Sequence, residues 1–305
     1  MQAETIWMDG EQVRWSEARV HVLSHALHYG TAVLEGTRAY GTPDGPAVFR
    51  LDEHLGRLYR SAKIIGLAIP YSPAQLRAAT LETVAANGLT SCYIRHLVHR
   101  GYGELGIAAR ACPTVVTVAA WEWGALLGEE GLRLMTSSWR RNDPAVVPTA
   151  AKATGPYLNS VIAKAEALDA GYDEAVLLNA AGYVSECTGA NVFVVSDGTL
   201  STPPSSAGAL EGITQDTVEQ LAAGLGVPVR RRDLLRTDLY TADEMFVCGT
   251  AAGIVPVQSV DNRELGAAGP VTAKLTAAYE AAVHGRDERY RHWLTPVPAG
   301  TRATR

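Results

Sequence analysis

Residues 148–155 read Pro-Thr-Ala-Ala-Lys-Ala-Thr-Gly, which places Lys152 among small and mostly apolar neighbours. Most lysines are solvated surface charges, so a single lysine says little about function. An apolar setting changes its chemistry, because desolvation disfavours the ammonium form and leaves a neutral amine that can act as a nucleophile. Both interpretations fit the composition of this stretch, and its meaning depends on the chain around it.

A helix and then closely spaced strands are predicted after this stretch. The spacing of apolar residues between 157 and 170 indicates an amphipathic helix. Its apolar face consists of Leu158, Val161, Ile162, Ala165 and Leu168. Strands are expected at 174–178, 183–186, 191–195 and 199–201, with a hairpin turn at Asp197-Gly198. Helices at 215–225 and 270–283 flank a further strand at 244–248.

Strands and helices also mix before this stretch. Asp9-Gly10 stands between two short strands and predicts a type I′ hairpin. Apolar residues at helical spacing predict helices at 51–65, through Leu51, Leu55, Leu58, Ala62 and Ile65, and at 73–86, before the Asn87-Gly88 pair. Further strands are expected at 47–49, 92–99, 114–120 and 132–137.

The order of these elements predicts an α+β fold in two lobes. At 305 residues the chain exceeds the usual size of one domain, and the glycine-punctuated segment 124–131 suits a linker. We expect a small α/β domain at 1–128, an interdomain loop at 129–136 and a larger domain at 137–285. The polar tail, 286–305, is expected to be loosely attached.

Charge and composition restrict the partners and the compartment. The formal net charge is −5, and the basic cluster at 230–232 is short, so nucleic acid is not an expected partner. No signal peptide is visible at 1–10, and no apolar run is long enough for a membrane helix. The four cysteines form no C-x-x-C pair. We therefore expect a cytoplasmic protein with buried reduced thiols and no metal site.

Two patterns suggest ligand sites that their context does not support. Gly101-Tyr-Gly-Glu-Leu-Gly106 matches a dinucleotide-binding fingerprint, but a strand rather than a helix is expected directly after it. Without a helix N-terminus a pyrophosphate lacks its usual partner, so a loop lining a site is the better interpretation. His21, His25 and His28 lack a further acidic or histidine ligand, which favours packed or hydrogen-bonded histidines.

Two glycine-led turns are more informative. Gly212-Ile213-Thr214 precedes the helix expected at 215–225, so Thr214 is expected to be its N-cap, and the free backbone N–H groups there suit an anion such as a phosphate ester. Residues 249–253, Gly-Thr-Ala-Ala-Gly, follow a predicted strand. They form either a tight turn or a backbone nest that binds an anion.

Together these segments resemble the class IV (fold type IV) pyridoxal-phosphate enzymes, and most closely the bacterial branched-chain amino-acid aminotransferases. The resemblance extends from about residue 6 to about residue 284. The matching stretches are Ser24-His-Ala-Leu-His-Tyr-Gly30, Thr149-Ala-Ala-Lys152, Gly155 to Asn159, Ser185-Glu-Cys-Thr-Gly-Ala-Asn-Val-Phe193, Gly212-Ile-Thr214 and Gly249-Thr-Ala-Ala252. The resemblance implies a small α/β domain joined to a larger one, pyridoxal phosphate at the domain interface, and a homodimer or larger homo-oligomer.

The resemblance also implies cofactor-binding roles. Lys152 matches the lysine that forms the Schiff base and shuttles a proton during transamination. Glu186 matches the carboxylate that faces the pyridine nitrogen, where the ion pair keeps that nitrogen protonated. Tyr157 matches the phenol that hydrogen-bonds O3′. The residues that match the surroundings of the cofactor phosphate are Arg57, Ile213, Thr214 and Thr250.

A substrate pocket is implied in the same way. The amides of Thr250 and Ala251, with Tyr93, match groups that hold the substrate α-carboxylate. The residues that match the outer pocket are Tyr29, Arg38 and Arg95, and the two guanidinium groups there suit the distal carboxylate of glutamate.

Four residues depart from the pattern of the branched-chain enzymes. Leu34 and Leu126 stand where aromatic residues usually line the side-chain pocket. Ala190 replaces a glutamate, and Gln215 replaces a basic residue. Each lost pocket contact shifts substrate preference by about 1–3 kcal/mol.

The resulting prediction is a transaminase that exchanges the amino group between an amino acid and a 2-oxo acid such as 2-oxoglutarate. Branched-chain or other hydrophobic substrates come first, then aromatic ones. A D-amino-acid or (R)-amine transaminase, or an aminodeoxychorismate lyase of the same fold, remains an alternative. A cofactor-binding or scaffold protein without catalysis is a rival of another class.

Overall fold

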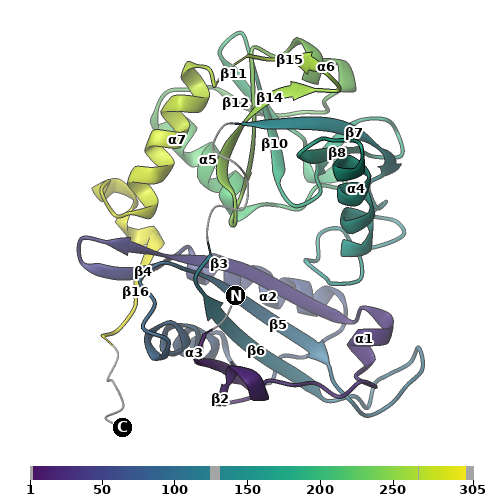
Figure 1. The fold of residues 1–305 in the computed structure, drawn as a ribbon, viewed down its shortest axis with the longest axis vertical. Coiled ribbons are helices and arrows are strands. Elements are labelled where there is room, and N and C mark those ends of the chain that lie inside the picture. The colour runs from purple at the N-terminus through teal and green to yellow at the C-terminus, as the bar shows by residue number, and fades with distance from the viewer. Residues whose placement is uncertain (1–2, 124–130, 267, 300–305) are drawn as a thin grey trace. The chain divides into compact units, whose positions relative to one another are not determined.

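The structure is a computed structural model that describes residues 3–123, 131–266 and 268–299. The chain folds into two compact units (Figure 1). The first unit contains residues 1–124, 151–155 and 282–305, and the second contains residues 125–150 and 156–281. The segment around Lys152 therefore groups with the N-terminal strands, although it follows them by many residues in the sequence.

A seven-stranded antiparallel sheet forms the first unit, in the order β16-β4-β3-β5-β6-β1-β2. Asp9 and Gly10 join β1 to β2 with φ angles of 47° and 103°, the positive values that a type I′ turn requires, so the predicted hairpin is confirmed. The strands are β1 (Thr5–Met8), β2 (Glu11–Arg14), β3 (Ala32–Thr42), β4 (Gly45–Phe49), β5 (Cys92–Arg100), β6 (Thr114–Trp121) and β16 (Leu294–Pro296).

Helices α2 (Leu51–Ile64) and α3 (Pro73–Ala86) confirm the predicted pair to within one residue. The side chains of Leu51, Leu55, Leu58 and Ala62 are buried, as the apolar spacing of α2 indicates. Ser72 and Gln75 form a capping box that fixes the start of α3. The remaining short helices of this unit are η1 (Trp15–Glu17), α1 (His25–Tyr29) and η3 (Glu288–Trp293).

The two faces of this sheet carry different side chains. Residues directly opposite on antiparallel strands share a face, and successive residues alternate between faces. Val33, Ile94 and Val118 lie on the face that packs against α2 and α3 to form the core of the unit. Leu34, Gly36 and the other even-numbered residues of β3 therefore lie on the opposite face.

The expectation of a loosely attached tail is wrong for residues 286–299. Strand β16 extends the sheet by pairing with β4, and the backbone N–H of Arg50 donates to the carbonyl of Trp293 at 2.7 Å. The Trp293 ring is buried and meets Phe49 edge to face, with ring centroids 5.8 Å apart. A three-residue strand that ends in proline lacks the alternation by which longer strands are detected.

A mixed nine-stranded sheet forms the second unit, in the order β12-β11-β10-β13-β14-β7-β8-β9, with β15 paired to β14. The β11–β12, β14–β7 and β7–β8 pairs are parallel. The strands are β7 (Leu132–Arg140), β8 (Glu174–Leu178), β9 (Val184–Cys187), β10 (Asn191–Ser196), β11 (Thr199–Thr202), β12 (Val229–Arg231), β13 (Glu244–Gly249), β14 (Gly253–Val260) and β15 (Arg263–Glu264). The helices are α4 (Tyr157–Asp169), η2 (Ser205–Ala207), α5 (Ile213–Gly224), α6 (Arg236–Thr241) and α7 (Pro270–Val283). The two sheets with their helices confirm the predicted α+β class.

Helix α4 forms where it is expected, but the opposite side of it is buried. The small residues Ser160, Ala163 and Ala167 face inward, and the two alanines pack with Ala175 and Leu177 of β8. Small side chains allow the helix to approach the sheet closely. The predicted apolar face is instead largely exposed, with Leu158, Val161 and Leu168 at 67%, 60% and 56% exposure.

The cysteines and the membrane prediction can be compared with the structure directly. All four cysteines are buried free thiols, as expected. Burial raises the pKa of Cys92 to about 12, and burial likewise raises the pKa of Cys187 and Cys248. Within the described part of the chain, no helix has both the length and the apolarity needed to cross a membrane.

A buried histidine makes the stability of the first unit depend on pH. His96 is fully buried, its Nε2 lies 2.8 Å from the Thr80 hydroxyl, and burial lowers its pKa from 6.5 to about 4. The folded state thus resists protonation that the unfolded state accepts. The contribution of His96 to the free energy of unfolding should therefore be complete above pH 6.5. It should fall by up to about 3 kcal/mol as the pH drops from 6.5 to 4.

We predict that His96→Gln flattens the decline of unfolding free energy between pH 6.5 and 4, as measured by urea unfolding. The exposed His28→Gln serves as the control. Parallel pH profiles for His96→Gln and the wild type would contradict the prediction.

Candidate functional site

The backbone of Lys152 is held on both sides. Its N–H donates to the Ser61 hydroxyl of α2 at 3.0 Å, and its carbonyl accepts from the Leu34 N–H of β3 at 2.9 Å. Ala153 forms an isolated antiparallel bridge with Val33, so this segment lies alongside the start of β3. Ala151 and Ala153 on either side are buried. Lys152 itself is half-buried.

Two glycines, Gly30 and Gly155, allow the Lys152 segment to lie close to the chain that leads into β3. Gly30 adopts a φ of 63°, and a Cβ there would lie 2.6 Å from the Gly155 Cα. The Gly155 N–H donates to the Gly30 carbonyl at 3.2 Å. A side chain at Gly30 would therefore push the Lys152 segment away from the chain that leads into β3, whereas one at Gly155 would meet the Gly30 carbonyl at 3.3 Å.

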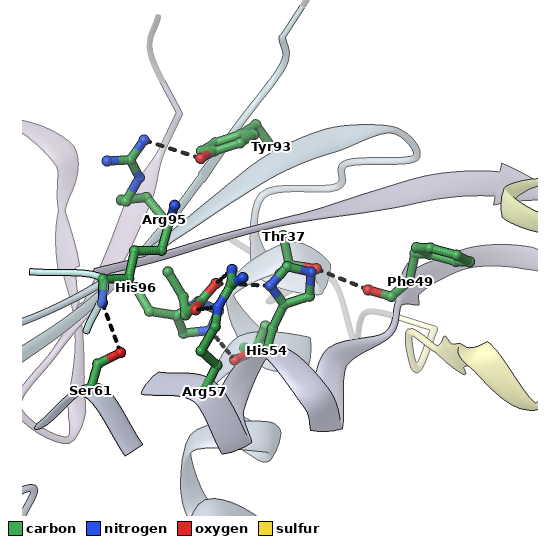
Figure 2. A network of polar contacts seen from close by, with 11 residues as sticks. Thr37, Phe49, His54, Arg57, Ser61, Tyr93, Arg95 and His96 are labelled. Atoms are coloured by element: carbon green, nitrogen blue, oxygen red, sulfur yellow. Dashed lines mark hydrogen bonds and ion pairs between the residues drawn. The ribbon is translucent and has the colours of Figure 1, made fainter. Parts of the chain in front are cut away.

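A buried ion pair lies beside the Lys152 segment in the same unit. Arg57 of α2 donates to Glu35 of β3 from Nε at 2.6 Å and from Nη2 at 2.9 Å. His54, one turn earlier on α2, places Nδ1 2.8 Å from the same carboxylate. Figure 2 shows Arg57 and His54 reaching from α2 into this network. Glu35 is fully buried and Arg57 is nearly so.

The charges in this network are fixed by its geometry. Burial alone would raise the pKa of Glu35, but the Arg57 charge and the hydrogen bonds from His54 and Arg57 hold it well below its usual value. Burial lowers the pKa of His54. His54 is therefore neutral, and because an ionised carboxylate only accepts, its Nδ1 carries the proton.

The opposite face of the same sheet carries Arg38, Tyr93 and Arg95. Arg38 pairs with Tyr93 across β3 and β5, and Gly36 pairs with Arg95. Arg95 Nη2 donates to the Tyr93 hydroxyl at 3.1 Å, which Figure 2 also shows. A Cβ at Gly36 would lie 1.8 Å from that hydroxyl, so only glycine leaves room for Tyr93.

Unsatisfied donors are present on this face. The Nε atoms of Arg38 and Arg95 are buried and, among the described residues, have no hydrogen-bond partner. Buried donors without acceptors are uncommon in folded proteins and suit a ligand that brings its own oxygen atoms. The Tyr93 ring packs against Trp121 and Trp123, with ring centroids 5.3 and 4.9 Å away.

The other predicted pocket residues fall in different settings. Leu34 is nearly buried and shares the face of Gly36 and Arg38. Tyr29 ends the short helix α1, and its ring is 48% exposed. Leu126 lies outside the described residues.

In the second unit, three donors hold the carboxylate of Glu186. Arg141 Nη2 lies 2.6 Å from Oε1, and the Leu210 N–H donates to Oε2 at 3.0 Å. Asn191 Nδ2 lies 3.3 Å from the same Oε2. Glu186 and Arg141 are both buried ion-pair partners, with side chains 9% exposed. This arrangement keeps a negative charge in place on β9.

Helix α5 begins next to this carboxylate. Thr214 is not its N-cap as expected, because the helix starts at Ile213 and Gly212 is the cap. Gln215 reaches back to accept from the Gly212 N–H at 3.2 Å. A Cβ on Gly212 would lie 2.0 Å from Asn191 Oδ1, so glycine is required here. The first turn of a helix leaves backbone N–H groups without partners inside the helix, which suits an anion.

The glycine-led segment 249–253 is the turn of a hairpin. Gly249 and Gly253 pair at the ends of β13 and β14, and Thr250 to Ala252 form the turn between them. A Cβ at Gly249 would lie 3.4 Å from the Gly189 carbonyl and 3.8 Å from Ala190. Gly249, where the turn begins, therefore lies against the middle of the Ser185–Phe193 stretch. Tyr157, the first residue of α4, belongs to the same unit.

The glycine pattern at 101–106 and the histidines at 21, 25 and 28 have structural roles and form no ligand site among the described residues. No helix follows Gly106 within residues 107–113, so the fingerprint lacks the element that a pyrophosphate needs. His25 is buried between the Thr31 hydroxyl and the Gly106 carbonyl, at 2.7 and 2.8 Å. Hydrogen-bonded histidines are confirmed at His21 and His28 as well.

Several residues in this region were not predicted from the sequence. Glu35 and Arg141 form ion pairs with residues far away in the chain, for which the sequence carries no periodic signal. Trp121 and Trp123 could have been found, because they stand at and just beyond the end of a strand whose neighbour carries Tyr93. Gly36 is visible only from its contact with Tyr93.

Comparisons with known proteins agree with this geometry. The family model described as amino-transferase class IV matches residues 32–260. The branched-chain-amino-acid aminotransferase of Escherichia coli K12 is 46% identical over 302 residues, covering 97% of this chain and 98% of that protein.

Solved structures are similar over the whole chain. The branched-chain aminotransferase of Thermoproteus uzoniensis with norvaline has a TM-score of 0.95 at 46% identity, covering 97% of this chain and 99% of that chain. The T.th. branched-chain amino acid aminotransferase complexed with N-(5′-phosphopyridoxyl)-L-glutamate has a TM-score of 0.94 at 49% identity, with the same coverage. On these matches the chain belongs to the class IV aminotransferase family and is an aminotransferase.

Proposed function

We propose that this chain is a pyridoxal-phosphate-dependent aminotransferase that exchanges the amino group between a branched-chain or other hydrophobic L-amino acid and a 2-oxo acid such as 2-oxoglutarate. One observation carries the proposal. Lys152 lies in a segment whose backbone is fixed between α2 and β3, beside the buried Arg57. The names of the similar proteins support the substrate class.

The chemistry of the donors fits the cofactor. Lys152 offers an amine, and Arg57, Ile213, Thr214 and Thr250 offer cationic, backbone and hydroxyl donors for a phosphate. The start of α5 is a glycine-capped helix terminus, and its Gly212 leaves no room for a side chain. Glu186 offers a fixed negative charge for a ring nitrogen that carries a proton. Tyr157 offers a hydroxyl for the phenolic oxygen.

Pyridoxal phosphate, when bound, supplies an aldehyde that accepts the amino group and a ring that stabilises the electron pair left at the substrate α-carbon. Lys152 would hold the cofactor and then, as a free amine, move the proton from the substrate α-carbon. Glu186, with Arg141 behind it, would hold the proton on the ring nitrogen. These are the roles that the side chains and their partners suit.

Substrate recognition is proposed for the face of the first unit's sheet that carries Arg38 and Arg95. Leu34 supplies an apolar wall, and Leu126 is proposed for the same pocket. The buried donors of Arg38 and Arg95 suit the distal carboxylate of glutamate. Tyr93 and the amides of Thr250 and Ala251 suit the α-carboxylate, and Tyr29 completes the proposed set. The comparisons do not favour a D-amino-acid or (R)-amine transaminase, or the lyase.

We also propose that the chain is a homo-oligomer in the cytoplasm. Leu158, Val161 and Leu168 form an exposed apolar stripe on α4, the kind of surface that a second copy would cover. The buried free thiols suit a reducing compartment.

Replacement of Lys152 tests the proposal. The wild type should absorb visible light as purified or after addition of pyridoxal phosphate, and should convert L-leucine and 2-oxoglutarate. Lys152→Ala should lower this rate by on the order of 10⁴-fold, because the variant lacks the amine that is proposed to move the proton. The exposed Lys63→Ala is the matched control. A wild type that takes up no cofactor, or a Lys152→Ala variant that retains the rate, would refute the proposal.

Gly36→Ala tests the substrate face separately. The added methyl group should displace Tyr93, and with it the acceptor of Arg95. The KM for L-leucine and 2-oxoglutarate should rise roughly ten-fold, while cofactor absorbance stays unchanged. Gly56→Ala on α2 is the control, since a Cβ there meets only the end of the Arg60 side chain at 3.4 Å. Unchanged KM values would exclude this role for Tyr93.

A further inference from the structure

Glu35 accepts two hydrogen bonds from the Arg57 guanidinium, so the pair restrains geometry as well as charge. Both bonds come from the Nε edge of the guanidinium, so they set the plane of the group as well as its position. His54 donates to the same carboxylate and restricts its rotation. Loss of this acceptor would remove the two bonds that set the plane of the Arg57 guanidinium.

The same fork ties α2 to β3 where both elements hold Lys152. Ser61, which accepts from the Lys152 N–H, stands one helical turn after Arg57. Leu34, which donates to the Lys152 carbonyl, is the chain neighbour of Glu35. A shift of α2 along β3 would therefore move Arg57 and the Lys152 backbone relative to each other.

We propose that Glu35 is a positioning residue of the cofactor site, which holds the Arg57 guanidinium in register with the Lys152 backbone so that one cofactor can meet both. This inference rests on the proposed function. Glu35 is assigned no contact with the substrate or the cofactor, and it acts through Arg57.

Removal of the Glu35 charge would have two opposing effects on phosphate binding by Arg57. Removal of the Glu35 charge would leave Arg57 more positive and, taken alone, would strengthen phosphate binding. Loss of the fork would leave the guanidinium misplaced, and a charge-assisted bond to the phosphate would be lost. The proposal requires that the second effect is larger, since charge-assisted bonds depend strongly on their geometry.

The test compares pyridoxal 5′-phosphate with pyridoxal, which has the aldehyde but no phosphate. Binding of each to the cofactor-free full-length protein is followed by absorbance, without substrate or turnover. The wild type should bind the phosphate form much more tightly. Glu35→Gln should narrow this preference by roughly ten-fold, mainly through weaker binding of pyridoxal phosphate.

Two variants serve as references, and a third replaces Glu35→Gln if that variant does not fold. Arg57→Lys should narrow the preference in the same way, because it removes the bidentate donor itself. Glu244→Gln removes another buried carboxylate, which accepts from the Val271 and Thr272 N–H groups at the start of α7, and should leave the preference unchanged. If Glu35→Gln does not fold, Glu35→Asp carries the test, because it keeps the charge but shortens the reach and should also narrow the preference.

The outcomes separate the two proposals. A wild type with no preference for the phosphate form would refute the proposed function and this inference together. A wild type with the preference, and a Glu35 variant that keeps or increases it, would refute only the role of Glu35. A merely structural role would weaken both ligands in parallel and leave their ratio unchanged, which also refutes the proposal.

Discussion

The two-point ion pair between Glu35 and Arg57 is the interaction on which the candidate site of the first unit depends. Both side chains are buried, and Glu35 also accepts from His54, so removal of Arg57 would leave a buried carboxylate that is only partly compensated. Because the pair joins a helix to a strand, it also sets where the backbone of Lys152 is held. Packing alone, through alanines and leucines of α2, would allow more freedom than a bidentate bond does.

The alternation of β3 then separates two tasks on neighbouring residues. Glu35 points to the core side, where α2 carries Arg57 and His54. Leu34, Gly36 and Arg38 point to the other side, where Tyr93 and Arg95 of β5 lie opposite. One strand thus serves both the proposed phosphate ligand and the proposed substrate face, and a shift of register by one residue would exchange them. In the second unit, one side chain likewise connects two parts of the candidate site. Asn191 of β10 donates to Glu186 of β9 and lies against Gly212 at the start of α5.

Periodic features could be predicted from the sequence, whereas contacts between distant residues could not. The spacing of leucines places α2 and its buried face correctly, because that helix packs through its large side chains. The same reasoning fails for α4, because its buried side is made of Ser160, Ala163 and Ala167 and its large side chains stay exposed. The preference of threonine for N-caps predicts Thr214 as the cap of α5, but Gly212 is the cap and Gln215 reaches back to its N–H.

Sequence motifs predicted more of the candidate site than hydrophobic periodicity did. The resemblance identified the family and named Lys152, Arg57, Glu186 and Tyr157, whose roles remain proposals. It gave no indication of Glu35, His54 or Arg141, because their partners are brought to them only by the fold. Of the residues that depart from the family pattern, Leu34 lies on the proposed substrate face and Ala190 lies beside Gly249.

The proposed chemistry depends above all on Lys152 as the residue that holds the cofactor. The most direct measurement is borohydride reduction of the purified protein loaded with pyridoxal phosphate, followed by peptide mass mapping. We predict one phosphopyridoxyl group per chain, fixed to Lys152, with loss of the visible absorbance. Cofactor mass on a different lysine, or on none, would contradict this role.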